Sequence, residues 1–577
     1  MIQSKKTILK HINNAIDNKK KEDVRLYKIR RIQKHHICRK AKVQKDLDYF
    51  YHSCRWVMHV IIQQQKEDGL KLTSYVPLYS KHLKKIIGNN YKAVIDHLVS
   101  AKIIMCNGKF SSSGHHSYKF KLSPKFKNEV PKFYTLKEKK LVKNIMAYRD
   151  LELDKLKERA KSIVYPISWL LKDPGLEIDL YESSDFVNTL ERKMYQELSA
   201  YYMTDKAKCT FIHDKISSYK EFLERWDKRK HEFHIDDSGE RLYNCLTEAP
   251  SVLRNFITYD GKTLVGLDIK NSQPFHFNVL LRDTFWRNNC KTAQLNLYNI
   301  SPTLYNEVKS VIPIIREIIQ VKSSNKKLAK EKILEILNRL HSEGNIKQDD
   351  IVPNIYMFPK NARTLVNKEM QTSNFPNLTK DGKLYKFILT HFPKLLPKNS
   401  GNDDLFSSRA QAKQSFIHMM YHNPEEMRSK AKQVFLIFFH LFPREAAIMM
   451  LLKNNYYKNF PRILQRIEAY IILRKIAEEV RKINADIPFF TIHDSILTTE
   501  EHVETLRETI AKVYSKNLGM VPELKETIYN DHNAMLEIRE YITRKADEKK
   551  FKMISRAPHP LQKFISNEMT SLLYILR

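Results

Sequence analysis

The stretch IPFFTIHDSILTTEE, Ile487–Glu501, gives the strongest indication of how the chain is built. A mostly apolar run leads into His493, Asp494 and Ser495, and a second short apolar run follows. This pattern predicts a hairpin of two buried strands with a carboxylate at its tip. A two-residue hairpin normally turns on Asn-Gly or Asp-Gly, and neither dipeptide is present. Asp494 is therefore either an ordinary turn residue or a side chain presented for chemistry, and a second carboxylate presented in the same way would favour chemistry.

The segment Gly261–Leu281, GKTLVGLDIKNSQPFHFNVLL, supplies that second carboxylate. Residues 264–267 predict a short buried strand that ends at Asp268, and the apolar run from Phe275 predicts a helix. Two strand-terminal carboxylates on neighbouring antiparallel strands can converge and hold two divalent cations about 3.5–4 Å apart. Oxygen ligands favour Mg²⁺, with Mn²⁺ as a possible substitute. Carboxylates are costly to bury, so buried ones are usually paired or bound to metal.

A third segment, residues 407–423, reads SSRAQAKQSFIHMMYHN. The spacing puts Arg409 and Lys413 on one face of a helix, with Tyr421 further along. Two cations on one face can bind a triphosphate, and an aromatic ring at the end can stack on a base. Taken alone, an Arg and a Lys four residues apart are more typical of a solvated basic face.

Charge indicates a polyanionic partner. The chain has 577 residues, enough for two to four domains, and 100 Lys+Arg against 65 Asp+Glu, a formal charge of +35. Such an excess most often accompanies nucleic-acid binding, although an AT-rich genome also inflates the lysine content. We therefore expect a nucleic acid as a partner.

Cysteine usage and hydropathy indicate the compartment. Six cysteines lie scattered without a C-x-x-C pair, which argues against a disulfide framework or a zinc knuckle and fits a reducing compartment. The N-terminus lacks the apolar core of a signal peptide, and the apolar run 434–443 is too short to cross a bilayer. We expect a cytoplasmic protein with no membrane partner.

The N-terminal part predicts its own small domain. A helix over Leu78–Ile87 should end at Gly88, and a second helix should follow with its apolar residues at Val94, Ile95, Leu98 and Val99. Residues 102–110 and 116–123 should form two strands. Helix, helix and hairpin resemble a winged helix, a fold that commonly binds duplex DNA and also serves as a protein-docking module.

These patterns predict four parts of the chain. They are a basic helical arm (1–55), a winged-helix-like domain (56–125), a helical connector or thumb-like region (126–235), and a domain with a helical insertion near 295–400 (236–577). Within the last part, Thr498 and Glu501 predict a capping box that begins a helix. The inner face of this helix should carry Val503, Leu506, Ile510 and Val513.

Together the three segments resemble motifs A, B and C of the family A nucleic-acid polymerases, which include bacterial repair-type DNA polymerases and phage-type single-subunit RNA polymerases. Motif A is a strand ending in Asp, similar to VGLDIKNSQPF. Motif B is Arg, Lys four residues later and Tyr eight after that, the spacing of Arg409, Lys413 and Tyr421. Motif C is His-Asp, followed by Glu in the DNA enzymes and by Ser in the RNA enzymes, and TIHDSI is similar to the latter. The resemblance covers residues 240–520 in the order of the family.

The resemblance implies a mainly helical α+β fold with a small antiparallel palm sheet, like a right hand, and a set of roles. Asp268 and Asp494 would bind two Mg²⁺ ions and act in catalysis together with Lys413. Lys413 and Arg409 would bind the incoming nucleoside triphosphate, and Tyr421 would pack near its sugar and base. Primer and template contacts would come from four further residues: Arg241, Arg254, Gln465 and His493. The chain departs from the family at His422, where motif B usually has Gly, and in its long gap between motifs A and B.

The product of such an enzyme is predicted from the residue five positions after the motif A Asp. The DNA enzymes have a bulky Glu there that crowds a ribose 2′-hydroxyl, and this chain has Gln273, which is also bulky. Ser495 and the pair His276–Phe277 are more similar to the RNA enzymes. Because sugar discrimination is steric, we expect DNA synthesis. The alternatives are a single-subunit RNA polymerase or primase and a non-catalytic DNA-binding replication initiator.

Overall fold

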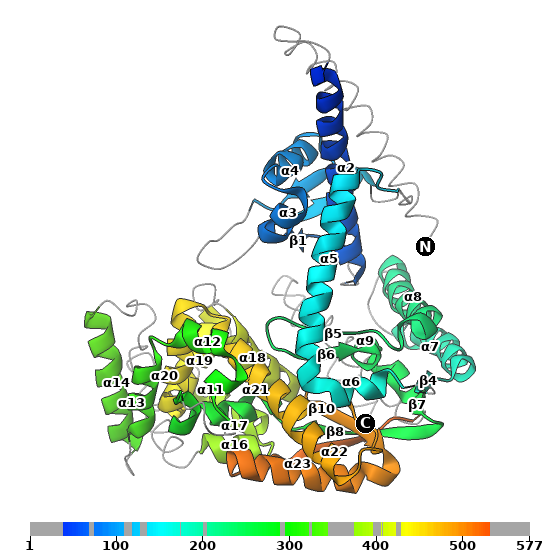
Figure 1. Ribbon diagram of the computed structural model, residues 1–577. Helices are drawn as coiled ribbons and strands as arrows, with labels where there is room; N and C mark the ends of the chain where they lie inside the picture. The colour runs from blue at the N-terminus through cyan, green and yellow to red at the C-terminus, as the bar shows by residue number, and fades with distance from the viewer. Residues whose placement is uncertain are drawn as a thin grey trace, which may run out of the picture. The chain divides into compact units, whose positions relative to one another are not determined.

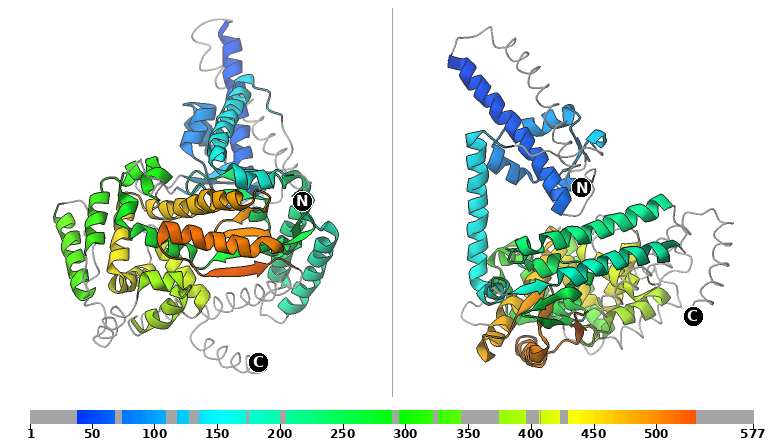
Figure 2. Two further views of the ribbon diagram at one scale, coloured as in Figure 1. Left: turned by 60° about the horizontal axis from the view of Figure 1, so that its bottom comes forward. Right: turned by 90° about the vertical axis from the view of Figure 1, so that its right-hand side faces the viewer.

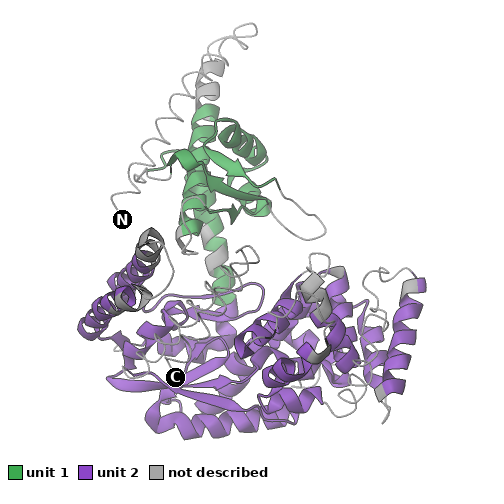
Figure 3. Cartoon of the chain, turned by 180° about the vertical axis from the view of Figure 1, so that it is seen from behind, with its two compact units in different colours: residues 1–158 green, residues 159–577 purple. Residues whose placement is uncertain are grey.

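The computed structural model describes residues 38–67, 74–108, 118–126, 135–172, 175–199, 205–288, 295–321, 326–343, 374–395, 406, 408–422 and 429–530. The chain divides into two compact units, Met1–Glu158 and Arg159–Arg577 (Figure 3). The division falls inside the segment 126–235, which the sequence predicts to be a helical connector.

The first unit combines helices with a three-stranded antiparallel sheet of order β1-β3-β2 (Figure 1). Its elements are α2 (Cys38–Glu67), β1 (Val76–Pro77), α3 (Ser80–Ile87), α4 (Tyr91–Ser100), β2 (Ile104–Cys106), β3 (Lys119–Leu122), η1 (Pro124–Phe126) and α5 (Lys139–Ala160), the last of which runs across the division. Helix α2 begins inside the predicted basic arm and continues beyond residue 55. Residues 1–37 of the arm and 109–117 of the predicted hairpin lie outside the described residues.

Packing in the first unit explains where α3 ends and which side chains of α4 are buried. Helix α3 ends because Gly88 takes a φ of 84°, which glycine adopts without a steric penalty. The Tyr49 hydroxyl donates to the carbonyls of Ile86 (3.2 Å) and Ile87 (3.1 Å), which satisfies the last turn of α3. Of the four apolar positions predicted on α4, Val94 and Leu98 are buried in the core and Ile95 is half-buried, whereas Val99 is exposed. The predicted order of helix, helix and two strands is therefore present, while the winged-helix assignment and its DNA contact stay predictions.

The second unit is built on a six-stranded sheet of order β4-β7-β8-β10-β9, with β11 also paired to β8. The strands are β4 (Leu176–Ile178), β7 (Ile257–Tyr259), β8 (Lys262–Ile269), β9 (Phe490–Ile492), β10 (Ser495–Thr499) and β11 (Leu524–Ile528). Every pairing is antiparallel. Gly266 lets the neighbours of β8 approach closely, because a Cβ there would lie 3.2 Å from Ser495 Oγ and 3.2 Å from the Tyr529 ring. A separate two-stranded sheet pairs β5 (Phe233–Ile235) with β6 (Leu242–Asn244).

Long helices pack next to this sheet. α21 (Asn459–Tyr470), the π-helix η9 (Ile471–Ile476) and α22 (Ala477–Ile483) follow one another without a break. α23 (Val503–Leu518) packs beside them and against β8 and β10 (Figure 2). The predicted inner face of α23, Val503, Leu506, Ile510 and Val513, is buried, which confirms that prediction.

The remaining elements surround this centre, and α7 packs along α8. They are η2 (Lys161–Ile163), α6 (Val164–Leu170), α7 (Leu180–Ser199), α8 (Asp205–Arg229), α9 (Cys245–Glu248), η3 (Ser251–Phe256), α10 (Ser272–Leu280), η4 (Asp283–Trp286), α11 (Leu297–Ile300), α12 (Pro302–Val308), α13 (Ile312–Gln320), α14 (Lys326–Ser342), α16 (Phe375–Lys380), α17 (Leu384–Leu395), α18 (Arg409–Tyr421), α19 (Ser429–Leu441), α20 (Pro443–Asn455) and η10 (Glu500–His502). The predicted insertion near 295–400 is helical where it is described.

The capping-box prediction at Thr498 is wrong. Thr498 is fully buried inside β10, opposite Val265 of β8, so strand pairing extends further than the sequence indicates. The residue that precedes η10 is Thr499, and its hydroxyl lies 3.5 Å from Glu501 Oε1.

The fold is thus mainly helical with small antiparallel sheets, which is the α+β class predicted from the sequence. In the described part of the chain, no helix has the length and apolarity required to cross a bilayer.

Candidate active site

Asp268 lies on β8, and Asp494 lies in the turn that leads into β10, the antiparallel neighbour of β8. Ser495 pairs with Asp268 in the register of β10 and β8, and the Ile269 N–H donates to the Asp494 carbonyl (3.4 Å). His493 and Asp494 form the turn between β9 and β10. His493 has a φ of 55°, in the left-handed region that residues other than glycine rarely adopt. A two-residue hairpin turn requires such a φ at its first residue, so this conformation places Asp494 at the tip of the hairpin.

The two carboxylates perturb each other. Desolvation raises the pKa of Asp494 to about 7, and the charges of Glu468 and Asp268 add to the rise. Desolvation also raises the pKa of Asp268 to about 6, where Lys413 and Lys525 oppose the rise and Glu468 adds to it. Two acids that hold their protons near neutral pH are typical of a site whose charge another cation is meant to balance.

The donor set fits Mg²⁺ in the company of a phosphate. In proteins Mg²⁺ is commonly held by one or two carboxylates, with water and substrate phosphates as the other ligands. Among the described residues, no group of three or more His, Cys, Asp or Glu is arranged to hold a metal ion. Asp268 and Asp494 alone would leave most of the coordination shell to water and to a bound ligand.

Helix α18 brings its basic residues toward this pair. Ser408 caps the helix by accepting from the Gln411 N–H (3.2 Å), so the helix begins at Arg409. Lys413 is exposed and close enough to Asp268 to lower the pKa of that carboxyl. Arg409 is not linked directly to the carboxylates but lies near Tyr385, whose raised pKa it counteracts.

Tyr421, at the end of α18, lies among the predicted site residues. Burial raises the pKa of Tyr421 to about 12, and the charges of Glu468 and Asp494 add to the rise. Arg241 and a hydrogen bond from Gln465 act in the opposite direction. The phenol therefore stays neutral and is held between the carboxylates and the residues predicted to contact primer and template.

A buried lysine anchors the same end of α18. The Lys453 ammonium of α20 donates to the carbonyls of Met419 (2.7 Å) and His422 (3.0 Å). Helix C-termini leave carbonyls without intrahelical partners, and a cation there also balances the helix dipole. Burial lowers the pKa of Lys453 to about 7. Lys453 thus fixes the end of the helix that carries Tyr421.

Glu468, which the sequence patterns did not indicate, joins the parts of the site. Glu468 lies on α21 with a side chain only 1% exposed, and it pairs with Arg241 at 2.6 Å. Its second oxygen accepts from the Ser272 hydroxyl (2.6 Å) and from Gln273 Nε2 (2.5 Å). A single acid in an otherwise apolar helix face was the available signal, because such an acid needs a partner. The family resemblance indicated only Gln465 on this helix.

Ser272 extends this network through a buried histidine. His276 Nδ1 lies 2.8 Å from the Ser272 carbonyl, and its Nε2 lies 2.8 Å from the Tyr514 hydroxyl of α23. Burial lowers the pKa of His276 to about 4, so the ring is neutral at physiological pH. The polar chain from Glu468 to Tyr514 fixes the first turn of α10, directly after the strand that carries Asp268.

Arg241 is positioned by a tight loop after β5. Asp236 accepts from the backbone N–H groups of Gly239 (2.7 Å) and Arg241 (2.7 Å) and from the Ser238 hydroxyl (2.6 Å). Burial alone would raise the pKa of Asp236, but these hydrogen bonds outweigh it and lower the pKa. Gln465 packs on this loop so closely that a Cβ at Gly239 would lie 2.9 Å from its side chain. The loop therefore holds Arg241 and Gln465 together.

His493 and Arg254 complete the set. The Arg254 Nε donates to the carbonyls of Leu246 (2.9 Å) and Ala249 (3.1 Å). Burial lowers the pKa of His493, and the charges of Arg241 and Arg254 reach the same ring. Five predicted residues are thus linked to the carboxylates or to Glu468: Lys413, Tyr421, Gln273, Arg241 and His493. Gln465 reaches them through Tyr421 and Arg254 through His493, whereas Arg409 lies apart, and the role of each stays a prediction.

Comparisons with known proteins add little. No protein-family profile matches the chain, and a comparison with curated proteins gives no match. Among solved structures, the chain is weakly similar to the POL domain of Pol1 from M. smegmatis in complex with DNA primer-template and dNTP. The TM-score is 0.25 at 10% identity, over 67% of this chain and 72% of that one. A likeness this weak carries no argument about fold or function.

Metal binding should depend on pH. Protons compete with a cation for Asp268 and Asp494 below about pH 7, because both pKa values are raised. We expect the affinity for Mn²⁺, followed by the EPR signal of the free ion, to rise steadily from pH 6 to pH 8. Calorimetry in two buffers of different ionisation enthalpy should detect proton release at pH 6.5 and little at pH 8.5. An affinity that does not change over this range would contradict the raised pKa values.

Removing the Glu468 charge should destabilise the chain. Glu468→Gln leaves the Arg241 guanidinium, whose side chain is 17% exposed, without its ion pair, and breaking a buried pair costs about 3–5 kcal/mol. The matched control is Glu307→Gln, which removes a more exposed pair (2.6 Å) with Arg462 of the same helix and should cost less than about 1 kcal/mol. Free energies of unfolding in urea measure both. Equal losses would mean that the Arg241–Glu468 pair stabilises no more than a surface contact.

Proposed function

We propose that this protein is a template-directed nucleic-acid polymerase that transfers nucleotidyl groups with two Mg²⁺ ions and favours DNA synthesis. The observation that carries the proposal is the pairing of β8 with β10, which brings Asp268 and Asp494 to neighbouring positions within reach of Lys413. Bound Mg²⁺ would neutralise the charge that develops on the transferred phosphate and lower the pKa of an attacking hydroxyl.

Each candidate site residue would then have a separate role. Asp268 and Asp494 would hold the metal ions as deprotonated carboxylates. The Lys413 ammonium, exposed at the metal pair, would bind the triphosphate, and Arg409, one turn earlier, would extend that grip. Tyr421 would pack against the sugar and base, since its phenol is neutral and anchored beside Asp494.

Four residues would contact the primer and the template: Arg241, Arg254, Gln465 and His493. The buried ion pair with Glu468 and the Asp236 loop hold Arg241 in one geometry, so little conformational entropy is lost when it binds a strand. Gln465, on α21, packs against the loop that carries Arg241 and hydrogen-bonds Tyr421. This arrangement would connect strand binding to the position of the nucleotide.

Gln273 would discriminate against ribonucleotides. Its side chain is buried, and its amide donates to Glu468, so it cannot move aside freely. A rigid bulky side chain next to the sugar would crowd a 2′-hydroxyl. An RNA polymerase or primase remains the alternative product class because Ser495 follows Asp494, as in the RNA enzymes of the family.

A second candidate function is a DNA-binding replication initiator without catalysis. The helix-helix-hairpin order of the first unit and the charge of +35 favour it. The costly desolvation of Asp268 and Asp494 favours catalysis instead, since a binding protein has no use for two such carboxylates.

Asp494→Asn separates these two functions. The amide keeps the size of the side chain and removes the charge that binds metal, so primer extension should fall by about two orders of magnitude or more. Template affinity should change little, because cationic side chains make the phosphate contacts. Asp486→Asn, at an exposed carboxylate shortly before the same hairpin, is the matched control and should extend primers normally. If the wild-type chain incorporates nothing with Mg²⁺ or Mn²⁺, the initiator function replaces the polymerase.

Gln273→Gly tests the choice of sugar. The kcat/KM for ribonucleotides relative to deoxyribonucleotides should rise by about tenfold or more, because the obstructing side chain is gone. Ser272→Ala is the matched control, since it also removes one hydrogen bond to the same Glu468 oxygen but keeps Gln273 in place. If Ser272→Ala relaxes the discrimination equally, the effect comes through Glu468 and Gln273 is not the gate.

A further inference from the structure

A groove of about 600 Å³ lies in the second unit between two sets of helices. One wall comes from Lys161–Ser168 of η2 and α6, and the other from Tyr470 at the end of α21 and from residues of η9 and α22 as far as Arg481. Its volume falls in the range of pockets that bind small ligands or a few nucleotides of a strand. A smaller adjoining cavity of about 20 Å³ shares Ser162, Tyr470 and Arg474 with it.

The groove is separate from the candidate active site. Glu468 and Tyr470 are two residues apart on α21, and two residues turn a helix by about 200°. Glu468 contacts Arg241 and Gln273, whereas the Tyr470 ring lines the groove. A ligand in the groove would therefore not occupy the position of a nucleotide at Asp268 and Asp494.

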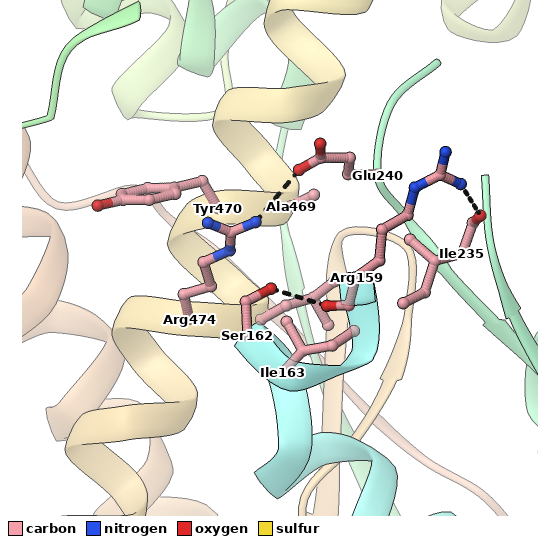
Figure 4. Close-up of a pocket in the computed structure, with 9 residues that line it drawn as sticks. Arg159, Ser162, Ile163, Ile235, Glu240, Ala469, Tyr470 and Arg474 are labelled. Atoms are coloured by element: carbon pink, nitrogen blue, oxygen red, sulfur yellow. Dashed lines mark hydrogen bonds and ion pairs between the residues drawn. The ribbon is translucent and has the colours of Figure 1, made fainter. Parts of the chain in front are cut away.

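The π-helix η9 places two cationic side chains over an aromatic ring in the groove. Residues four and five positions after Tyr470 both come over its ring, with Arg474 at 5.4 Å and Lys475 at 5.3 Å from the ring centroid. π-helical turns are rare and occur frequently at functional sites. Arg474 is fixed further by its ion pair with Glu240 at 3.3 Å, which Figure 4 shows beside Ser162 and Arg159.

The lining charge favours an anionic ligand. Four cationic side chains, Lys161, Arg474, Lys475 and Arg481, face the groove against one acid, Glu478. Cations around an aromatic ring are the combination with which proteins bind single-stranded nucleic acid, since phosphates pair with the cations and a base stacks on the ring. An acidic peptide would satisfy the cations but would make no use of the ring.

We propose that this groove binds a single strand of nucleic acid, with phosphates at Lys161, Lys475 and Arg481 and a base against Tyr470. The inference rests on the proposed function in one respect, namely that the chain binds a nucleic-acid strand. It adds a binding surface outside the proposed site of nucleotide transfer. Replacing any cation that binds a phosphate should weaken binding and reduce its dependence on salt, because fewer counterions are then released.

The test measures binding without catalysis. Fluorescence anisotropy of a labelled single-stranded DNA with the full chain in EDTA gives the Kd at several salt concentrations. Lys475→Glu with Arg481→Glu should raise the Kd about tenfold or more and flatten the salt dependence. The matched control is Lys309→Glu with Lys516→Glu, an equal charge change at exposed positions outside the groove, and it should change the Kd less than about twofold.

Two further measurements separate the ring from the charge and the groove from the active site. Tyr470→Leu should raise the Kd about fivefold or more, because a leucine cannot stack on a base. A strand carrying 5-iodouracil should crosslink to Tyr470 in the wild-type chain and equally in Asp494→Asn. Equal Kd values for the groove and control variants, or polyglutamate competing as well as the strand, would overturn the proposal. Because EDTA removes catalysis from the assay, a chain that extends no primer can still pass or fail this test.

Discussion

The register of β8 against β10 is the constraint on which the rest of the second unit depends. Side chains alternate across a strand, so a slip of one residue would turn Asp268 to the opposite face and move it away from the β9–β10 turn. Gly266 opposes that slip, because a shift of one residue would put Val265 or Leu267 where Ser495 and Tyr529 leave little room for a side chain. Strand packing thus brings Asp268 and Asp494 to neighbouring positions, and no direct bond between the two aspartates is needed.

Glu468 holds the surroundings of that sheet together. It connects the β5–β6 loop through Arg241, the first turn of α10 through Ser272 and Gln273, and α21 through its own backbone. A buried carboxylate with a single partner would be destabilising, but three donors satisfy both oxygens of Glu468. The residues predicted to contact the strand and those predicted to contact the nucleotide therefore share Glu468 as a partner. A substitution that moves Glu468 would affect both groups.

Local patterns predicted much of this architecture, and long-range partners accounted for what they missed. The strand at Asp268, the hairpin at Asp494 and the helix from Arg409 to Tyr421 follow from periodicity and spacing within short windows. Glu468 did not, because its partner Arg241 is 227 residues away in the sequence. Thr498 was assigned to a cap because its hydroxyl suits one, whereas pairing with β8 keeps it in the strand. The π-helix at Ile471–Ile476 has no sequence signature, since its apolar pattern also fits an α-helix.

The hydrogen bonds of Lys453 hold the C-terminal end of α18 in place. The helix has 13 residues, so at 1.5 Å per residue Arg409 lies about 18 Å from Tyr421. A rotation of about 10° around the anchored end would leave Tyr421 almost stationary and carry Arg409 through about 3 Å, roughly the length of a hydrogen bond. Lys413, one turn closer to the anchor, would travel about two-thirds of that distance. A tilt of this size would therefore change the positions of Arg409 and Lys413 while it leaves Tyr421 in place.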